Sequence, residues 1–345
     1  MKIAVYGASG FQGGLVVAEL ARRGIETVLV GRDKDRLKNA AAQAGVPDAE
    51  LQLAAIDDTE ALVSAFRYSD AVINCAGPFT PHGDRVIRAA ITAGCHYVDT
   101  AGEQLYMKRV YDTFMAEAEQ AGVTVVPAVT DGGVPGDLLA RLLAERLEGP
   151  IDLITSVHRI TLGGGVGISR GSLRSFAHFG EDGGLAYEDG AWRADNFPIP
   201  APIILPDESS ATPVVRFPLQ EVVTVPRHVQ VRSVQGLMEE ELSKAFGPVS
   251  SEFVESWPET PDETGLAEQS WRVVIDAVSE DGRRARGVAQ GRDTYGTTAL
   301  TVVEGAIRLA DGKAPAGVRT PAQAFDPVSF LDSLVPHGTS WTIEI

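Results

Sequence analysis

Short apolar segments alternate with amphipathic segments along the first 150 residues of the chain. The apolar segments are continuous, as in a sheet covered on both faces, and predict strands at 2–6, 27–30, 51–55, 71–74, 96–98 and 123–126. Apolar residues at helical spacing between them predict helices at 11–23, 33–44, 58–66, 82–93 and 103–120. This alternation predicts the α/β class, with a doubly wound parallel sheet of the Rossmann type.

The pattern changes after Pro135. One more helix is predicted at 136–147, with Pro135 in position to open it. Longer strands and loops rich in glycine and proline follow from 151 to about 290, which predicts a mixed α+β domain. We therefore expect a Rossmann domain at 1–134 and an α+β domain for substrate binding or dimerisation at 135–295, with the C-terminal helices of 296–335 packing back on the first domain.

Composition narrows the classes of function. Apolar residues make up 44% and charged residues 22% of the chain, as in ordinary globular proteins. The net charge of −17 repels phosphate backbones and argues against nucleic-acid binding. Two cysteines form no disulfide framework, and the six histidines lack metal-ligand spacing, so we expect no metal. The chain shows neither a signal peptide nor an apolar run near the ~18 residues of a membrane span, so we expect a cytoplasmic protein without membrane contact.

The strongest motif is a glycine loop between the first strand and the first helix. Its sequence is Gly7-Ala8-Ser9-Gly10-Phe11-Gln12-Gly13. Glycines permit a tight turn and a close approach of the backbone to a pyrophosphate, which the helix N-terminus then attracts. The GxxGxxG spacing is a variant of the Rossmann fingerprint, and its place between a strand and a helix predicts a dinucleotide site at residues 7–12.

The end of the second strand predicts which dinucleotide is bound. NAD-binding proteins usually place an acidic residue there for the ribose hydroxyls. Here the sequence is Gly31-Arg32-Asp33, and Arg32 stands where a 2′-phosphate needs a cation. Asp33 is better placed as the N-cap of the next helix. We therefore predict NADP(H) as the cofactor.

A third segment of the site follows the fourth strand. It reads Cys75-Ala76-Gly77-Pro78-Phe79. In a doubly wound sheet, ligands bind beyond the carboxyl ends of the strands. We therefore expect this small turn to contact the cofactor, with the Phe79 ring as a wall for the nicotinamide.

These segments together resemble the saccharopine dehydrogenase-like oxidoreductases, which include saccharopine reductase and the trans-acting enoyl reductases. Further matching segments are His82-Gly83, 94–99, 101–103 and 131–137. The resemblance is good over 1–140 and thin between 180 and 270. It implies an NAD(P)-binding Rossmann domain, a second α+β domain, and hydride transfer to or from a C=N or C=C bond. It leaves the substrate open, because members of the family differ most in the second domain.

Reduction of such a bond often needs a proton donor beside the hydride donor. Four ionisable groups follow predicted strands: His82, Asp99, Glu103 and Asp131. A structural role as a helix cap or first-turn residue competes with catalysis for each of them. We place His82 and Asp131 first as catalytic residues, because both adjoin glycine or proline turns that face the predicted cleft.

The second domain offers a set of cationic side chains: Arg170, Arg174, His178, Arg227, His228 and Arg232. Two arginines could clamp the carboxylate of a small-molecule substrate, although a solvated surface explains the same residues equally well. A homodimer through this domain is also left open.

Other classes of protein compete with the dehydrogenase. No tyrosine has a lysine four residues later, which argues against a short-chain dehydrogenase, and no Gly-x-Ser-x-Gly elbow supports a hydrolase. Two alternatives stay open. One is a non-catalytic sensor or scaffold that binds NADP(H), and the other is an auxiliary reductase that acts on a carrier-bound intermediate held by a partner protein.

Overall fold

The computed structural model describes residues 1–162, 166–178, 184–194, 196–198, 200–206, 208–245 and 250–345. Within these residues the chain divides into two compact units. We call residues 1–101, 106–131 and 295–325 the first unit, and residues 102–105, 132–294 and 326–345 the second unit.

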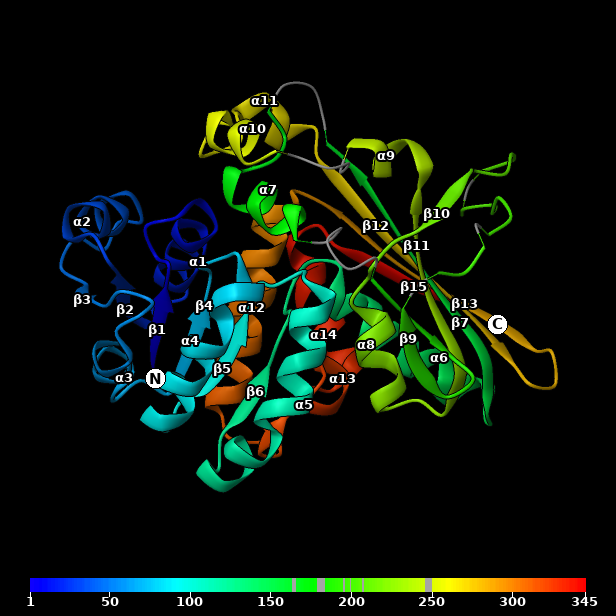
Figure 1. Ribbon diagram of the computed structural model, residues 1–345, viewed down its shortest axis with the longest axis horizontal. Coiled ribbons are helices and arrows are strands. Elements are labelled where there is room, and N and C mark those ends of the chain that lie inside the picture. The colour runs from blue at the N-terminus through cyan, green and yellow to red at the C-terminus, as the bar shows by residue number, and fades with distance from the viewer. Residues whose placement is uncertain (163–165, 179–183, 195, 199, 207, 246–249) are drawn as a thin grey trace. The chain divides into compact units, whose positions relative to one another are not determined.

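The first unit is built on a parallel sheet. Its described strands are β1 (Lys2–Tyr6), β2 (Glu26–Gly31), β3 (Glu50–Leu53), β4 (Ala71–Asn74), β5 (His96–Asp99), β6 (Thr124–Val126) and β14 (Gly317–Val318). They lie in the order β14-β6-β5-β4-β1-β2-β3, and every pair is parallel (Figure 1). This order reverses beside β1, as in a Rossmann fold, so the carboxyl ends of β1 and β4 mark the place where a ligand binds.

The helices of the first unit connect and flank these strands. They are α1 (Phe11–Arg22), α2 (Lys34–Gln43), α3 (Thr59–Phe66), α4 (Phe79–Ala93), most of α5 (Gln104–Ala121), most of α12 (Thr294–Ala310), and α13 (Pro321–Ala324). Helix α12 lies against α1, where Arg23 and Glu304 form an ion pair at 2.5 Å. A segment far along the chain therefore completes the first unit.

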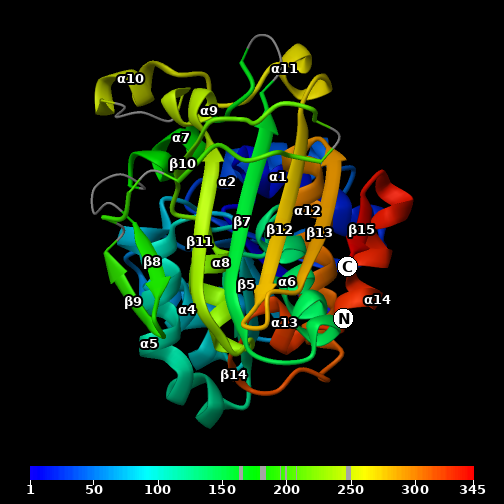
Figure 2. The ribbon, with the colours of Figure 1, turned by 90° about the vertical axis from the view of Figure 1, so that its right-hand side faces the viewer.

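The second unit is a mixed sheet with short helices. Its described strands are β7 (Ile151–Thr161), β8 (Leu185–Glu188), β9 (Ala191–Ala194), β10 (Val214–Arg216), β11 (Val231–Glu239), β12 (Ser270–Ser279), β13 (Arg284–Arg292) and β15 (Ser340–Glu344). Strand β7 lies between β11, which is parallel to it, and β12, which is antiparallel (Figure 2). The predicted Rossmann and α+β architectures are both confirmed.

Helices cover this sheet unevenly. The described helices are α6 (Gly133–Leu147), α7 (Arg170–Ala177), α8 (Glu221–Thr224), α9 (Glu240–Ala245), α10 (Ser251–Ser256), α11 (Glu263–Ala267) and α14 (Pro327–Leu334), with 3-10 turns at Val225–Arg227 and Val335–His337. Helix α6 packs on one face, where Leu139 comes so close to Gly287 that a β-carbon there would lie 3.1 Å away. On the other face Val157, Leu237 and Val274 pack with Leu205 and Val214.

Two helices begin three residues earlier than the sequence pattern predicts. Helix α4 begins at Phe79 rather than at residue 82, and α6 begins at Gly133 rather than at residue 136. In each case a proline, Pro81 or Pro135, is the third residue of the helix. Proline is tolerated there because the first N–H groups of a helix have no partner within the helix. The prolines therefore lie inside the first turns, and Pro135 does not open its helix.

We expect Gly13→Ala to destabilise the protein by about 2 kcal/mol, because its β-carbon would lie 2.1 Å from the Gly7 carbonyl oxygen. The matched control is Gly14→Ala in the same helix, where nothing lies within 4 Å of the new β-carbon. Alanine should stabilise that position by about 0.5–1 kcal/mol. Urea unfolding of the two variants measures both effects, and equal midpoints would contradict the packing argument.

Candidate functional site

The glycine loop is a tight turn held on two sides. Gly7 follows β1 with φ at +79°, and its N–H donates to the Val30 carbonyl at 3.0 Å. A β-carbon on Gly7 would lie 3.0 Å from the backbone nitrogen of Ala76, and one on Gly13 would meet the Gly7 carbonyl oxygen. Only glycine fits where the backbone is left-handed and two segments of the chain approach each other this closely.

The N-terminus of α1 is open to an anion. Its N-cap is Gly10, which is exposed and offers no side-chain cap to the first turn. The N–H groups of such a turn, together with the positive end of the helix dipole, bind phosphate groups. Ser9, Phe11 and Gln12 are half-buried around this turn. The residues present therefore fit the diphosphate of a dinucleotide.

Two arginines follow β2, Arg32 directly after the strand and Arg36 in the first turn of α2. Arg32 is exposed directly after the strand. Asp33 caps α2 by accepting hydrogen bonds from the N–H groups of Asp35 and Arg36, which confirms the predicted N-cap. The Arg36 guanidinium reaches back to the Ser9 carbonyl at 3.4 Å. The sequence analysis did not single out Arg36. Its side chain reaches the glycine loop because the residue lies in the first turn of α2.

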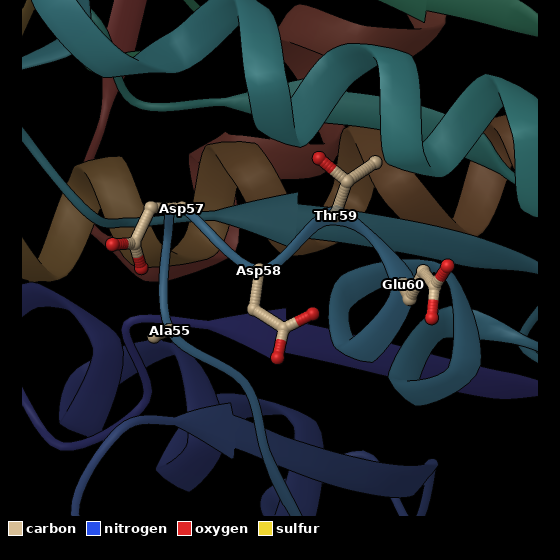
Figure 3. Close-up of a pocket in the computed structure, with 5 residues that line it drawn as sticks. All are labelled: Ala55, Asp57, Asp58, Thr59 and Glu60. Carbon is tan, nitrogen blue, oxygen red and sulfur yellow. The ribbon is translucent and has the colours of Figure 1, made fainter.

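An acidic pocket follows β3. Ala55, Asp57, Asp58, Thr59 and Glu60 line it, and Figure 3 shows the adjacent carboxylates of Asp57 and Asp58 pointing in different directions. The Asp58 side chain caps α3 through the Ala61 N–H at 2.9 Å. Burial raises the pKa of Tyr6 to about 12, while the charge of Arg32 lowers this pKa and that of Asp57 raises it. Both charges therefore act at the carboxyl end of β1.

The loop after β4 is fixed by a buried asparagine. The Asn74 Oδ1 accepts a hydrogen bond from the Ala76 N–H at 3.0 Å, and Nδ2 donates to the Tyr97 hydroxyl at 3.0 Å. Cys75 donates its N–H to the Tyr6 carbonyl, and burial raises the pKa of its thiol. The Gly77–Pro78 peptide is cis, and Gly77 is exposed at the tip. The loop therefore presents small backbone groups beside the glycine loop.

Asp99, at the end of β5, is the anchor beneath this loop. Its carboxylate is fully buried and accepts four hydrogen bonds: from the hydroxyls of Tyr97 (3.0 Å) and Tyr106 (2.7 Å), and from the N–H groups of Ala101 (3.1 Å) and Ala128 (2.8 Å). Burial raises the pKa of this carboxyl, and the four donors oppose that shift. Asp99 is therefore a structural group, one of the two roles that its sequence position allowed.

Two residues expected in the loop lie elsewhere. His82 is a half-buried residue in the first turn of α4, because that helix begins at Phe79. The Phe79 side chain is 4% exposed and packs on Tyr106 with ring centroids 5.7 Å apart. Its ring belongs to the core, which corrects the expectation that it walls the nicotinamide. Gly83 also packs here, since a β-carbon on it would lie 2.4 Å from the Tyr106 ring.

Asp131 is tied to the start of α12. The Thr298 hydroxyl donates to the Asp131 Oδ1 at 2.9 Å and accepts from the Asp131 N–H at 3.1 Å. One turn earlier in the same helix, Tyr295 accepts a hydrogen bond from the Gln12 Nε2 at 3.2 Å and packs on Phe11 at 5.0 Å between ring centroids. Helix α12 thus brings Asp131 and the glycine loop within one helical turn of each other.

The cationic residues of the second unit already have partners. Arg174 pairs with Glu255 at 2.7 Å, Arg232 pairs with Asp152 at 2.7 Å and with Asp189, and Arg170 donates to the Trp257 carbonyl. Arg227 lies over the Trp192 ring, and His228 contacts Asp137 at 2.7 Å. These contacts do not assemble the arginine clamp for a carboxylate that the sequence allowed.

Within the described part of the chain, no group of three or more histidine, cysteine or carboxylate side chains is arranged to hold a metal ion. No described helix has the length and apolar character that crossing a membrane requires.

The fold and the glycine loop define a Rossmann-type dinucleotide-binding protein. Residues 3–126 match the family described as saccharopine dehydrogenase NADP binding domain. The match confirms, over these residues, the resemblance to the saccharopine dehydrogenase-like oxidoreductases seen in the sequence. NADP(H), as predicted from Arg32, is the cofactor of this domain.

Individual relatives agree with this family. The chain is 29% identical over 171 residues to a lipid droplet localized protein of Caenorhabditis elegans, covering 47% of this chain and 40% of that protein. It is 29% identical over 140 residues to a trans-acting enoyl reductase of Mycobacterium bovis, covering 39% of this chain and 34% of that protein. The chain thus spans well under half the length of these relatives. The first name places that relative on lipid droplets and lends no support to the cytoplasmic location expected here.

A solved structure shares the whole fold. The apo saccharopine dehydrogenase (L-Glu forming) of Saccharomyces cerevisiae aligns with a TM-score of 0.65 at 14% identity, and the alignment covers 100% of both chains. At this identity the likeness establishes the fold alone.

We expect Tyr106→Phe to cost about 2 kcal/mol of unfolding free energy, because it removes a hydrogen bond to a buried carboxylate. The matched control is Tyr111→Phe, which removes a 3.3 Å bond to the neutral Arg319 carbonyl and should cost about 1 kcal/mol or less. Urea unfolding at neutral pH compares them. A smaller loss for Tyr106→Phe than for Tyr111→Phe would contradict the anchoring role of Asp99.

Proposed function

We propose that the protein is an NADP(H)-dependent oxidoreductase that transfers a hydride to or from a C=N or C=C bond of a small metabolite. The observation that carries the proposal is the start of α12, where Tyr295 contacts the glycine loop and Thr298 contacts Asp131. A carboxylate held this near the cofactor loop is suited to proton transfer beside a hydride transfer. The family and the fold support the same class of reaction.

The residues that would hold NADP(H) follow from the geometry of the first unit. Residues 7–12 would bind the diphosphate at the N-terminus of α1, and Arg32 with Arg36 would bind the 2′-phosphate. The backbone of residues 75–78 would border the nicotinamide end, with Phe79 holding that loop from the core. When bound, the cofactor supplies or accepts the hydride.

Asp131 is the first candidate for the proton transfer. Its Oδ1 accepts a hydrogen bond from the Thr298 hydroxyl, which orients the carboxylate. The residue is half-buried, so a substrate can reach it. His82 is the second candidate. A carboxylate-bearing substrate and a homodimer stay predictions.

The similarity to a trans-acting enoyl reductase favours C=C over C=N as the first bond to test. The same similarity is consistent with the alternative of an auxiliary reductase that needs a carrier-bound substrate. The sensor or scaffold alternative predicts binding of NADPH without oxidation by any acceptor.

We expect Arg32→Ala and Arg36→Ala each to raise the Kd for NADPH by about 10-fold or more, since each removes a charge-assisted contact to the 2′-phosphate. The Kd for NADH should stay within about twofold, because NADH lacks that phosphate. Arg67→Ala, an exposed arginine at the end of α3, is the control of equal charge. Fluorescence titration with both nucleotides measures the constants. An unchanged NADPH Kd in both arginine variants would refute the assignment.

We expect Asp131→Asn to lower kcat by about 10²- to 10⁴-fold, the usual contribution of a positioned general acid or base. NADPH oxidation is followed with a panel of cyclic imines, enoyl thioesters and their carrier-bound forms. Asp112→Asn, on the surface of α5, is the matched control. Full turnover in Asp131→Asn moves the role to His82, and no oxidation with any acceptor supports the sensor.

A further inference from the structure

The mixed sheet of the second unit ends in a strand that is paired along one edge only. Strand β15 lies at the border of the sheet, and β13 is its single partner among the described residues (Figure 2). Its side chains alternate between half-buried Trp341 and Ile343 on one face and exposed Ser340, Thr342 and Glu344 on the other. The backbone groups along the second edge of β15 are therefore left for one more strand.

The other border strands of this sheet carry protections that β15 lacks. Proteins guard an edge strand by keeping it short, or by placing a charge, a proline or a bulge in it. Strand β9, at the opposite border, has four residues and includes the exposed Arg193, and β10 has three residues and ends at Arg216. Strand β15 has five residues in unbroken register with β13, and its charge, Glu344, stands at its end. No lysine or arginine occurs from residue 320 to residue 345.

Exposed apolar side chains lie beside this strand. Val328 on α14 is 41% exposed, and Val335 in the turn that follows is 46% exposed. Asp332 lies between them at helical spacing, so the three residues share one side of the helix. The Asp332 Oδ1 accepts a hydrogen bond from the Trp341 indole N–H at 3.0 Å. This bond joins the exposed side of α14 to β15 within the second unit.

The segment that carries this surface is poor in charge. Asp332 and Glu344 are the two charged residues among the 19 residues 327–345, whereas 22% of the whole chain is charged. At a net charge of −17, two copies of the chain repel each other wherever acidic surfaces meet. Depletion of charge together with exposed apolar side chains is typical of the centre of a protein interface. Two copies therefore approach each other here with little repulsion.

Strand β15 is complementary to a second copy of itself. In an antiparallel pair centred on Thr342, the Trp341 of one copy lies opposite the Ile343 of the other, and the two Thr342 side chains face each other. Glu344 then lies opposite Ser340, so no like charges meet. Pairs of an aromatic with a β-branched side chain, and pairs of threonines, stabilise antiparallel strands. This register uses every residue of β15.

We propose that the protein forms a homodimer in which β15 pairs with β15 of a second copy, antiparallel about a twofold axis at Thr342. The pairing joins the mixed sheets of the two copies into one sheet, and the exposed side of α14 flanks the junction. A twofold axis is the commonest symmetry of oligomers, and it requires the self-complementary register that β15 has. The inference goes beyond the proposed reaction and does not depend on it.

The pair at the axis supplies the first test, by sedimentation velocity of the full chain over a concentration series. We expect the unaltered protein to dimerise, and Thr342→Asp to raise the dissociation constant of the dimer about tenfold or more, because two carboxylates then face each other. Ala194→Asp, which adds the same charge at an exposed position of β9, is the matched control and should change this constant by less than about twofold. An unaltered protein that stays monomeric, or equal weakening in both variants, would overturn the proposal.

Two gains of affinity test the register, and misfolding cannot produce either of them. Thr342→Lys should weaken the dimer as Thr342→Asp does, but an equimolar mixture of these two variants should dimerise, because opposite charges then meet at the axis. Ser340→Lys should lower the dissociation constant, because its ammonium group faces Glu344 of the other copy. A mixture that stays monomeric, together with a Ser340→Lys dimer no tighter than the unaltered one, would overturn the pairing of β15.

Discussion

The first unit depends on how the Asp99 carboxylate is satisfied in the core. A buried carboxylate without partners is costly, and four donors offset part of that cost here. The donors come from β5 and the loop after it, from α5 and from the segment after β6, so one side chain ties these parts of the first unit together. The same Tyr97 hydroxyl also accepts from Asn74, which shapes the loop after β4. The geometry of the loop after β4 is therefore set by the buried side chains that lie beneath it.

Close backbone approach is the second constraint, and it explains why glycines gather at the site. Gly7 faces Ala76, Gly13 faces the Gly7 carbonyl, and Gly83 faces the Tyr106 ring. At each of these positions, another part of the chain occupies the space that a side chain would need. The two loops at the carboxyl ends of β1 and β4 therefore lie against each other. A dinucleotide that binds along both loops meets backbone rather than side chains. In the proposed binding mode, selectivity for NADP(H) falls to side chains farther out, which follow β2.

The sequence predicts what depends on local pattern. Strand and helix periodicity locates the Rossmann strands to within a residue or two. The strand-loop-helix context predicts a cofactor loop at residues 7–12 and a role for Arg32 in binding the cofactor. It fails where the answer depends on a distant partner. The Phe79 ring looks available until Tyr106 covers it, and Thr298 and Arg36 become visible only when the fold brings them to Asp131 and Ser9. The predicted starts of α4 and α6 are too late, because the sequence analysis took a proline as the boundary of the helix. Proline is also tolerated within the first turn of a helix.

Asp99 and Glu221 show two different uses of a buried carboxylate. Asp99 has donors on both oxygens, as a group that only stabilises the fold should have. Glu221 has a histidine on one oxygen and no partner on the other among the described residues. Burying a carboxylate that is only partly satisfied is costly, so the chain around it must at least avoid steric conflict. Gly132 and Gly136 meet this need, because a β-carbon at either position would lie within 3 Å of the His158 ring or the Glu221 carboxylate.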